Sequence, residues 1–245
     1  MTSLDAGGGS MDRQMRSEVV REVLYIPSDD PRYPVSLKTH LADKASASIA
    51  VFGDITILQN KSLAVFCSSK CPGSIIIKTY DLMKQLREKG VTVIGGFHSA
   101  IERECLNILL KGRQSIIYCP ARGIERMKIR PEIRKPLEDG RLLMLSPFGF
   151  KQRRISADLA DTRNYFVAAL AQAIFVSYAA PGSKTERFCA RLMTRNKVVY
   201  MLQDERNGNP IVSGARSVTE IADLQLSEAG LTEASKRARI KTLKL

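Results

Sequence analysis

The sequence predicts an α/β fold in which a doubly wound, mostly parallel sheet carries helices on both faces. Residues 63–66 are a short apolar run, residues 75–89 repeat apolar side chains at helical spacing, and residues 91–94 are a second apolar run. This strand–helix–strand order is typical of neighbouring parallel strands. The alternation continues to residue 202, and 245 residues are enough to bury one such core.

Short apolar runs and apolar side chains at helical spacing also predict the other strands and helices. Beyond the first unit, strands are expected at residues 49–52, 115–119, 141–145, 174–178 and 197–202, and helices at residues 99–111, 162–173 and 186–194. The basic, proline-interrupted residues 121–136 are expected to form a loop with short helices. In the helix at 75–89, the buried face is expected to carry Ile76, Tyr80, Met83 and Leu86.

Composition divides the chain into four parts. Residues 1–20 contain three successive glycines and are expected to be flexible. Residues 21–60, rich in Pro and Asp, form a lead-in that packs on the core, and residues 61–203 form the core domain. Residues 204–245 lose the periodicity, end in a basic stretch and are expected to be a tail.

Net charge gives the first indication of function. The formal charge of +13 favours a polyanionic partner, most simply nucleic acid. No apolar run reaches the roughly 18 residues that a bilayer span needs, so no membrane partner is expected. Residues 1–20 lack the apolar core of a secretory signal, which predicts a cytoplasmic protein with reduced thiols. Cys67 and Cys71 have no second ligand pair at metal spacing, and neither a metal nor a cofactor is expected.

Two turns at the carboxyl ends of predicted strands are candidate phosphate sites. Residues 67–73 open a helix, whose N-terminal amides favour anions, and Ser68, Ser69 and Lys70 add hydroxyls and a positive charge. Gly95 and Gly96 end the next strand, where glycine lets a ligand approach the backbone. Alternatively, both are ordinary turns with no ligand.

Further cations follow other strands at the same edge of the sheet. The loop after residue 119 is basic, and residues 182–185 follow the strand at 174–178. Arg163 could clamp a phosphate or could pair with Asp158 or Asp161. The candidate phosphate-binding residues are therefore Ser68, Ser69, Lys70, Gly95, Gly96, Arg122, Arg126, Lys128, Arg163, Asn164, Gly182, Ser183, Lys184 and Thr185.

Several of these segments, taken in order, resemble the DNA-processing protein A (DprA/Smf) family. Residues 30–37, Asp-Pro-Arg-Tyr-Pro-Val-Ser-Leu, resemble the family's D-P-x-Y-P-x-x-L. Residues 64–70 fall on its A-I-V-G-S-R-K, residues 91–96 on its T-V-V-S-G, and residues 163–170 on its R-N-R-I-I-A-G-L. The resemblance covers roughly residues 25–203. Cys67, Ser69, Ala100 and Tyr165 replace residues that the family usually has.

The resemblance implies an extended Rossmann-like fold, here with the core domain only. It implies a basic pocket for single-stranded DNA, a mediator role beside a RecA-type recombinase, and a homodimer. The matching site residues are Ser68, Lys70, Gly96, Arg163 and Asn164. The first hypothesis is therefore a non-enzymatic DNA-binding protein that serves recombination in DNA uptake or processing.

Two alternatives remain open. Arg163-Asn164, together with residues 181–186, weakly resembles the cytokinin-activating phosphoribohydrolases, which implies a nucleotide-binding sensor or a hydrolase of nucleoside monophosphates. Arg163 and Glu186 would then be the catalytic pair. A third reading, suggested by the replaced residues of the first turn, is an adaptor whose ligand site has been lost.

Overall fold

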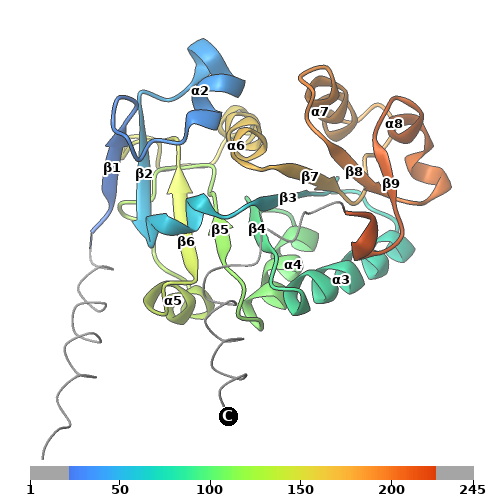
Figure 1. Cartoon of the computed structure of the whole chain (residues 1–245), viewed down its shortest axis with the longest axis horizontal. Helices are drawn as coiled ribbons and strands as arrows, with labels where there is room; N and C mark the ends of the chain where they lie inside the picture. Colours follow the sequence, from blue (N-terminus) through green and yellow to red (C-terminus); the bar gives the residue numbers. More distant parts are fainter. Residues whose placement is uncertain (1–21, 225–245) are drawn as a thin grey trace, which may run out of the picture.

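Residues 22–224 are described by a computed structural model and contain one nine-stranded sheet (Figure 1). Its order is β1-β2-β6-β5-β4-β3-β7-β8-β9. Strand β2 pairs antiparallel with β1 and β6, and every other neighbouring pair is parallel. The strands are β1 (Leu24–Pro27), β2 (Ser48–Gly53), β3 (Ser62–Phe66), β4 (Thr92–Gly95), β5 (Ile116–Tyr118), β6 (Leu142–Ser146), β7 (Ala173–Val176), β8 (Val199–Leu202) and β9 (Arg216–Val218).

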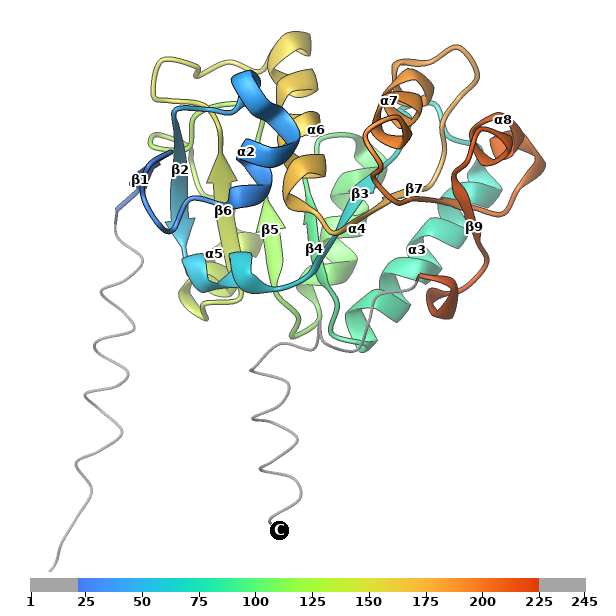
Figure 2. The same ribbon diagram turned by 45° about the horizontal axis from the view of Figure 1, so that its top comes forward.

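Helices cover both faces of this sheet (Figures 1 and 2). They are α2 (Val35–Leu41), α3 (Gly73–Glu88), α4 (Ala100–Leu110), α5 (Pro131–Glu138), α6 (Ala157–Leu170), α7 (Lys184–Met193) and α8 (Gly208–Val212). Helices α3, α4 and α5 lie on one face, and α2, α6 and α7 lie on the other. The predicted doubly wound fold is confirmed. None of the helices in residues 22–224 has the length and hydropathy that a membrane span requires.

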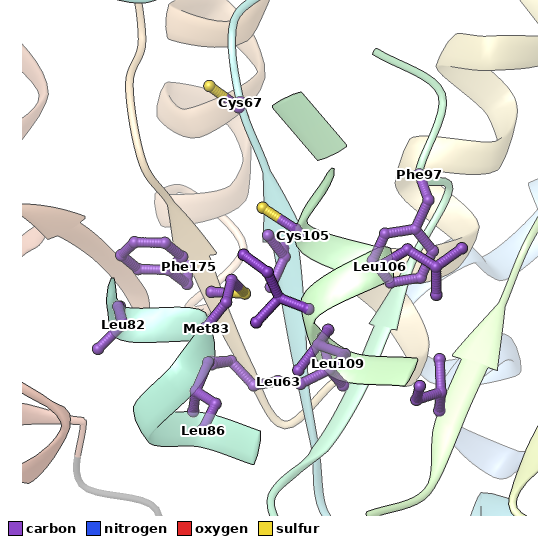
Figure 3. Close-up of a cluster of buried hydrophobic side chains, with 14 of the residues drawn as sticks. Leu63, Cys67, Leu82, Met83, Leu86, Phe97, Cys105, Leu106, Leu109 and Phe175 are labelled. Atoms are coloured by element: carbon purple, nitrogen blue, oxygen red, sulfur yellow. The ribbon is translucent and has the colours of Figure 1, made fainter. Parts of the chain in front are cut away.

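Successive side chains of the central strand β3 point to opposite faces of the sheet and so enter two separate hydrophobic cores. On β3, Leu63 and Val65 enter the core beneath α3 and α4, whereas Ala64 and Phe66 enter the core beneath α6 and α7. All four side chains are buried, as expected for a strand covered on both faces. Figure 3 shows the first of these cores, in which Met83 and Leu86 of α3 lie beside Leu63 and the α4 side chains, while Leu82 lies on the side of Phe175.

The lead-in segment contributes directly to the sheet through β1 and β2. Its aspartate–proline turn is fixed by Asp30, whose Oδ1 accepts hydrogen bonds from the Arg32 backbone N–H at 2.8 Å and from Arg32 Nε at 2.9 Å. Tyr33 is buried, and its hydroxyl donates to the Ser46 carbonyl at 2.7 Å. The motif at residues 30–37 therefore anchors the start of the chain to the core.

The structure corrects the predicted face of helix α3. Ile75, Thr79 and Leu82 are buried with Met83 and Leu86, whereas the expected Ile76 and Tyr80 are only partly buried. Three successive isoleucines at 75–77 leave the helical phase undecided in the sequence. The packing partners on β3 and α4 set that phase by selecting the residues that fit between them.

Two boundaries also differ from expectation. Helix α6 begins at Ala157 because the Ser156 hydroxyl accepts the Leu159 N–H at 3.2 Å, and it ends before the predicted residue 173. The segment expected to be a tail from residue 204 adds strand β9, which pairs in parallel with β8. Only Val218 of β9 is buried, so this strand has no alternating pattern to read. The expected flexible residues 1–20 and the basic stretch at 236–244 lie outside the described residues.

Candidate nucleic-acid interface

The carboxyl ends of β3, β4 and β7 meet where the chain reverses its direction across the sheet. From β3 the chain winds toward β4, β5 and β6, and it later returns to the other side of β3 as β7. Such a reversal leaves a crevice outside the carboxyl ends of the strands. The predicted turns at residues 67–73, 95–99 and 177–185 all lie at this edge.

The turn after β3 is held by hydrogen bonds within the chain. The Ser68 N–H donates to the Tyr178 carbonyl at 2.9 Å, and Ser68 Oγ accepts the Ala180 N–H at 3.1 Å. Ser68 is buried, whereas Ser69 and Lys70 are exposed. Ser68 therefore joins the ends of β3 and β7, whereas Ser69 and Lys70 present their side chains to solvent.

Glu102 is a buried carboxylate at this edge that the sequence reasoning did not assign to the site. Its two oxygens accept the backbone N–H groups of Cys67, at 3.3 Å, and of His98, at 3.0 Å. These amides end β3 and follow β4, where an anion would otherwise bind. The signal in the sequence is the place of Glu102 three residues after Ser99, in the Ser-x-x-Glu pattern that opens a helix.

Arg163 lies directly over Gly96, at the carboxyl end of β4. Its guanidinium is buried, and Nη1 donates to the Cys119 carbonyl at 3.2 Å. A Cβ on Gly96 would lie 0.8 Å from Arg163 Nη1, so this glycine makes room for the arginine of the same chain. A Cβ on Gly95 would likewise lie 3.0 Å from the Phe97 ring.

The charge of Arg163 has no carboxylate partner among residues 22–224. The alternative of a salt bridge to Asp158 or Asp161 is not what the structure shows, and Arg163 Nε is buried without a hydrogen-bond acceptor in the described part of the chain. Burying a cation that has no nearby negative charge costs free energy on the order of several kcal/mol. A bound anion would offset that cost, which makes Arg163 the strongest buried candidate for a phosphate contact.

A cleft of about 220 Å³ opens between α6 and α7 beside these residues. It is lined by Phe66, Cys67, Glu102, Asp161, Asn164, Tyr165, Lys184, Thr185, Arg187, Phe188 and Arg191. Of the predicted residues it brings together Asn164, Lys184 and Thr185. It adds Arg187 and Arg191, which the sequence analysis missed although their spacing from Lys184 places the three cations on one face of a helix.

The start of helix α7 uses two of the predicted residues as a cap. Ser183 Oγ accepts the Glu186 N–H at 3.1 Å, and Glu186 Oε2 accepts the Gly182 N–H at 2.7 Å. This reciprocal arrangement satisfies amides that a helix start leaves unpaired. Neither Glu186 nor Arg163 lines the cleft, so the pair considered for catalysis does not share it.

Two loops further along the sheet edge form an exposed basic surface. The loop after β5 contains Arg122, Arg126 and Lys128, of which Arg126 and Lys128 are exposed. It packs against the loop at residues 147–156, since the Gly123 N–H donates to the Gln152 carbonyl at 2.8 Å. Both loops leave the end of the sheet at which α6 begins (Figure 2).

The loop at residues 147–156 carries the one aromatic side chain that stands out from this surface. Phe150 is 56% exposed, and it is followed by exposed Lys151, Arg153 and Arg154. No hydrophobic periodicity marks this loop in the sequence, and none of the candidate phosphate-binding residues lies in it. We call the exposed set the loop platform; it consists of Arg126, Lys128, Phe150, Lys151, Arg153 and Arg154.

No cluster of three or more His, Cys, Asp or Glu side chains that could hold a metal ion occurs within residues 22–224. The cations of the edge come from loops and from helices α6 and α7. Cys105, Cys119 and Cys189 are buried in the core, and burial raises the pKa of the Cys119 and Cys189 thiols to about 12.

Comparison with known proteins places this architecture in context. The family model of DNA recombination-mediator protein A matches residues 24–233. DNA processing protein A from Streptococcus pneumoniae has a similar structure, with a TM-score of 0.69 and 19% identity over 85% of this chain and 75% of that one. The protein of the same name from Helicobacter pylori, whose structure concerns its single-stranded DNA binding mode, has a TM-score of 0.64 and 15% identity over 82% of this chain and 93% of that one. No curated protein sequence matches the chain.

Proposed function

Because the chain belongs to the DNA recombination-mediator protein A family, we propose that it binds single-stranded DNA along the carboxyl edge of its sheet. A role in DNA processing comes with that family. We further propose that it acts in the cytoplasm as a recombination mediator. The H. pylori protein of similar fold binds single-stranded DNA, which supports the same ligand class here.

The observation that carries the proposal is the loop platform. Proteins that bind single strands without sequence preference combine cations along the phosphate backbone with aromatic rings on which bases stack. Phe150 offers such a ring, and Lys151, Arg153 and Arg154 follow it in the same loop. A duplex keeps its base faces stacked on each other, so this arrangement favours a single strand.

Two further groups extend the proposed path of the strand. The exposed Ser69 and Lys70 stand at the end of β3, and the cations of the cleft stand on α7. Arg163 would hold one phosphate at the crevice, where its buried charge lacks a carboxylate in the described residues. Gly95 and Gly96 contribute by leaving room for Phe97 and Arg163, and Ser183 by capping α7.

The test is a titration of the purified protein with fluorescent oligo-dT and with a duplex of equal length, followed by fluorescence anisotropy. The double variant Arg153→Ala/Arg154→Ala is expected to weaken oligo-dT binding at least about ten-fold, because two phosphate contacts are lost. Phe150→Ala is expected to weaken it by about 1–3 kcal/mol and to reduce the preference for the single strand.

A matched control removes the same charge from the opposite edge of the sheet. Lys89→Ala/Lys111→Ala deletes two exposed cations that follow α3 and α4, at the amino ends of β4 and β5. This control should bind within about two-fold of the wild type. Equal losses of affinity in both double variants would mean that only the overall charge attracts DNA. If the wild type does not bind DNA even at low salt, the adaptor hypothesis is the one that remains.

A nucleotide ligand is a second candidate, favoured by the cleft between α6 and α7. Lys184, Arg187 and Arg191 line it beside Tyr165, a combination that fits a phosphate and an aromatic base. Since Glu186 and Arg163 lie outside the cleft lining, the geometry favours a sensor over a hydrolase. A thermal shift with nucleoside monophosphates that is lost in Arg187→Ala would support this site, and base release abolished by Glu186→Gln would instead support hydrolysis.

The proposed protein partners are a RecA-type recombinase and a second copy of the chain. Both are properties expected of a mediator in this family. Light scattering of the purified protein would give the mass of a dimer if the second proposal is right, and a monomeric mass at all concentrations would contradict it.

A further inference from the structure

Two cysteines flank the turn between β3 and α3. Cys67 directly follows β3, and Cys71 directly precedes Pro72, the N-cap of α3. Cys67 Sγ donates to the Ser68 carbonyl at 3.3 Å and Cys71 Sγ donates to the Pro72 carbonyl at 3.7 Å. The two thiols lie near enough across the turn for each to shift the pKa of the other. Cys67 is buried, whereas Cys71 is partly exposed. One thiol is thus partly open to reagents and has a second, buried thiol near it.

The surroundings of Cys71 favour its thiolate form. The neighbouring Cys67 thiol lowers the pKa of Cys71, and the guanidinium of Arg206 lowers it further, against the opposing effects of partial burial and of the Asp204 carboxylate. Arg206 is held in place because its Nη2 donates to Ser74 Oγ at 2.8 Å and to Asp204 Oδ2 at 2.9 Å. The neighbouring Cys71 thiol, together with burial, raises the pKa of Cys67 well above its ordinary value.

We propose that Cys71 and Cys67 are a redox pair, in which the exposed thiol reacts with a peroxide and the buried thiol then closes a reversible disulfide. Redox-sensitive cysteines are exposed, lie in electropositive surroundings and often stand next to a resolving thiol. Cys71 and Cys67 meet these conditions by their positions at the two ends of one turn, by the partial exposure of Cys71 and by the influence of each thiol on the pKa of the other. This inference goes beyond DNA binding and does not depend on it.

The chemistry balances with hydrogen peroxide as the oxidant. The Cys71 sulfur attacks one peroxide oxygen, the O–O bond breaks, and the second oxygen leaves as water, so that Cys71 becomes a sulfenic acid. The Cys67 sulfur then attacks Cys71 Sγ, the S–O bond breaks, and the oxygen leaves with the Cys67 proton as a second water. Two thiols and one peroxide thus give one disulfide and two waters.

The consequence falls on the turn that carries Ser69 and Lys70. A disulfide would close residues 67–71 into a small ring and restrict the two solvent-facing residues within it. Ser68, bonded to Tyr178 and Ala180, ties that ring to the end of β7. The remaining cysteines, Cys105, Cys119 and Cys189, are buried in the core and are poorly placed to compete for the oxidant.

The chain offers a direct readout. Trypsin cleaves after Lys61, Lys70 and Lys78, so Cys67 and Cys71 fall on separate peptides, residues 62–70 and 71–78. The native full chain is treated with hydrogen peroxide, alkylated without reduction, digested and analysed by mass spectrometry. The expected product is these two peptides joined by a disulfide, which dithiothreitol separates. Before oxidation, Cys71 is expected to react with iodoacetamide at least about ten-fold faster than Cys189.

Variants separate the two roles. In Cys67→Ser the Cys71 sulfenic acid has no resolving thiol and is expected to be trapped by dimedone on the peptide 71–78. In Cys71→Ser neither the cross-link nor the dimedone adduct should form. A disulfide to another cysteine, cross-linking only between molecules, or equal alkylation of Cys71 and Cys189 would overturn the proposal, whatever the protein does with DNA.

Discussion

At the scale of the residue, the buried site is organised around the pair Gly96 and Arg163. The sequence places the two 67 positions apart, and only the fold brings the guanidinium over the glycine. The fit leaves no space for a side chain on Gly96. Arg163 keeps a hydrogen bond to the Cys119 carbonyl but has no carboxylate in residues 22–224, so its charge is available to an anion.

Gly96→Ala tests this fit. The added Cβ would overlap Arg163 Nη1, so the arginine or the β4 end must move, at a cost of about 2 kcal/mol in the free energy of unfolding. Urea denaturation measures this change in the free energy of unfolding. Gly208→Ala is the matched control, because a Cβ there meets no atom within 4 Å, and it should leave stability unchanged or slightly raised. Equal stability of both variants would show that Arg163 does not occupy this position.

At the scale of the element, the segment after β8 is fastened to helix α3 by charged side chains. Asp204 accepts hydrogen bonds from Arg206 Nε at 2.7 Å and lies 3.6 Å from Lys78 Nζ on α3. Arg206 in turn reaches Ser74 at the start of the same helix. These contacts hold η3 (Glu205–Asn207) and the strand that follows against the rest of the sheet.

This fastening predicts a stability change at acidic pH. The side-chain hydrogen bonds of Arg206 lower the pKa of Asp204 to about 2. Because the folded-state pKa lies below the unfolded value near 3.8, the contribution is complete above about pH 4 and is lost as the pH falls toward 2. Asp204→Asn should therefore lower the unfolding free energy at pH 7 by about 1 kcal/mol, a figure reduced for solvent screening.

Chemical denaturation of the wild type and of Asp204→Asn at several pH values checks this sign. The difference between the two proteins should shrink between pH 4 and pH 2. Asp158→Asn is the control, because Asp158 lies in the exposed first turn of α6 and its carboxylate forms no ion pair within residues 22–224. A difference for Asp204→Asn that stays constant down to pH 2 would contradict the assigned role.

At the scale of the whole molecule, a net charge of +13 is combined with one candidate binding edge. The loops after β5 and β6, the turn after β3 and helix α7 all lie at the carboxyl ends of parallel strands. A long-range positive field attracts any polyanion, whereas within residues 22–224 this edge adds an exposed aromatic ring, Phe150, and a buried arginine, Arg163. Attraction and positioning are therefore separable by experiment.

The salt dependence of DNA binding separates long-range attraction from positioning at this edge. The affinity for oligo-dT is expected to fall linearly on a plot of log K against log salt, with a slope of roughly −0.7 for each phosphate contacted. Arg153→Ala/Arg154→Ala should make that slope shallower by about 1.4, since two contacts are removed. Lys89→Ala/Lys111→Ala should leave the slope unchanged, and a slope that both variants change equally would place the DNA elsewhere.

The sequence predicted the core strands well because β3, β4, β7 and β8 are buried on both faces and are therefore almost entirely apolar. Asn164, Lys184 and Thr185, which are phosphate-binding candidates in the sequence through their place before or after such strands, line one cleft. It missed strand β9, which buries a single residue.

The sequence by itself determined the fold class, the mostly parallel direction of the strands and the basic charge of the protein. Hydrophobic periodicity and charge are local properties of the chain. Only the tertiary structure decided which candidates meet. It set Arg163 against Gly96, placed the Glu102 carboxylate on the amides at the ends of two strands, and exposed Phe150 among cations. These outcomes depend on contacts between residues far apart in the chain, and such contacts leave no period in the sequence.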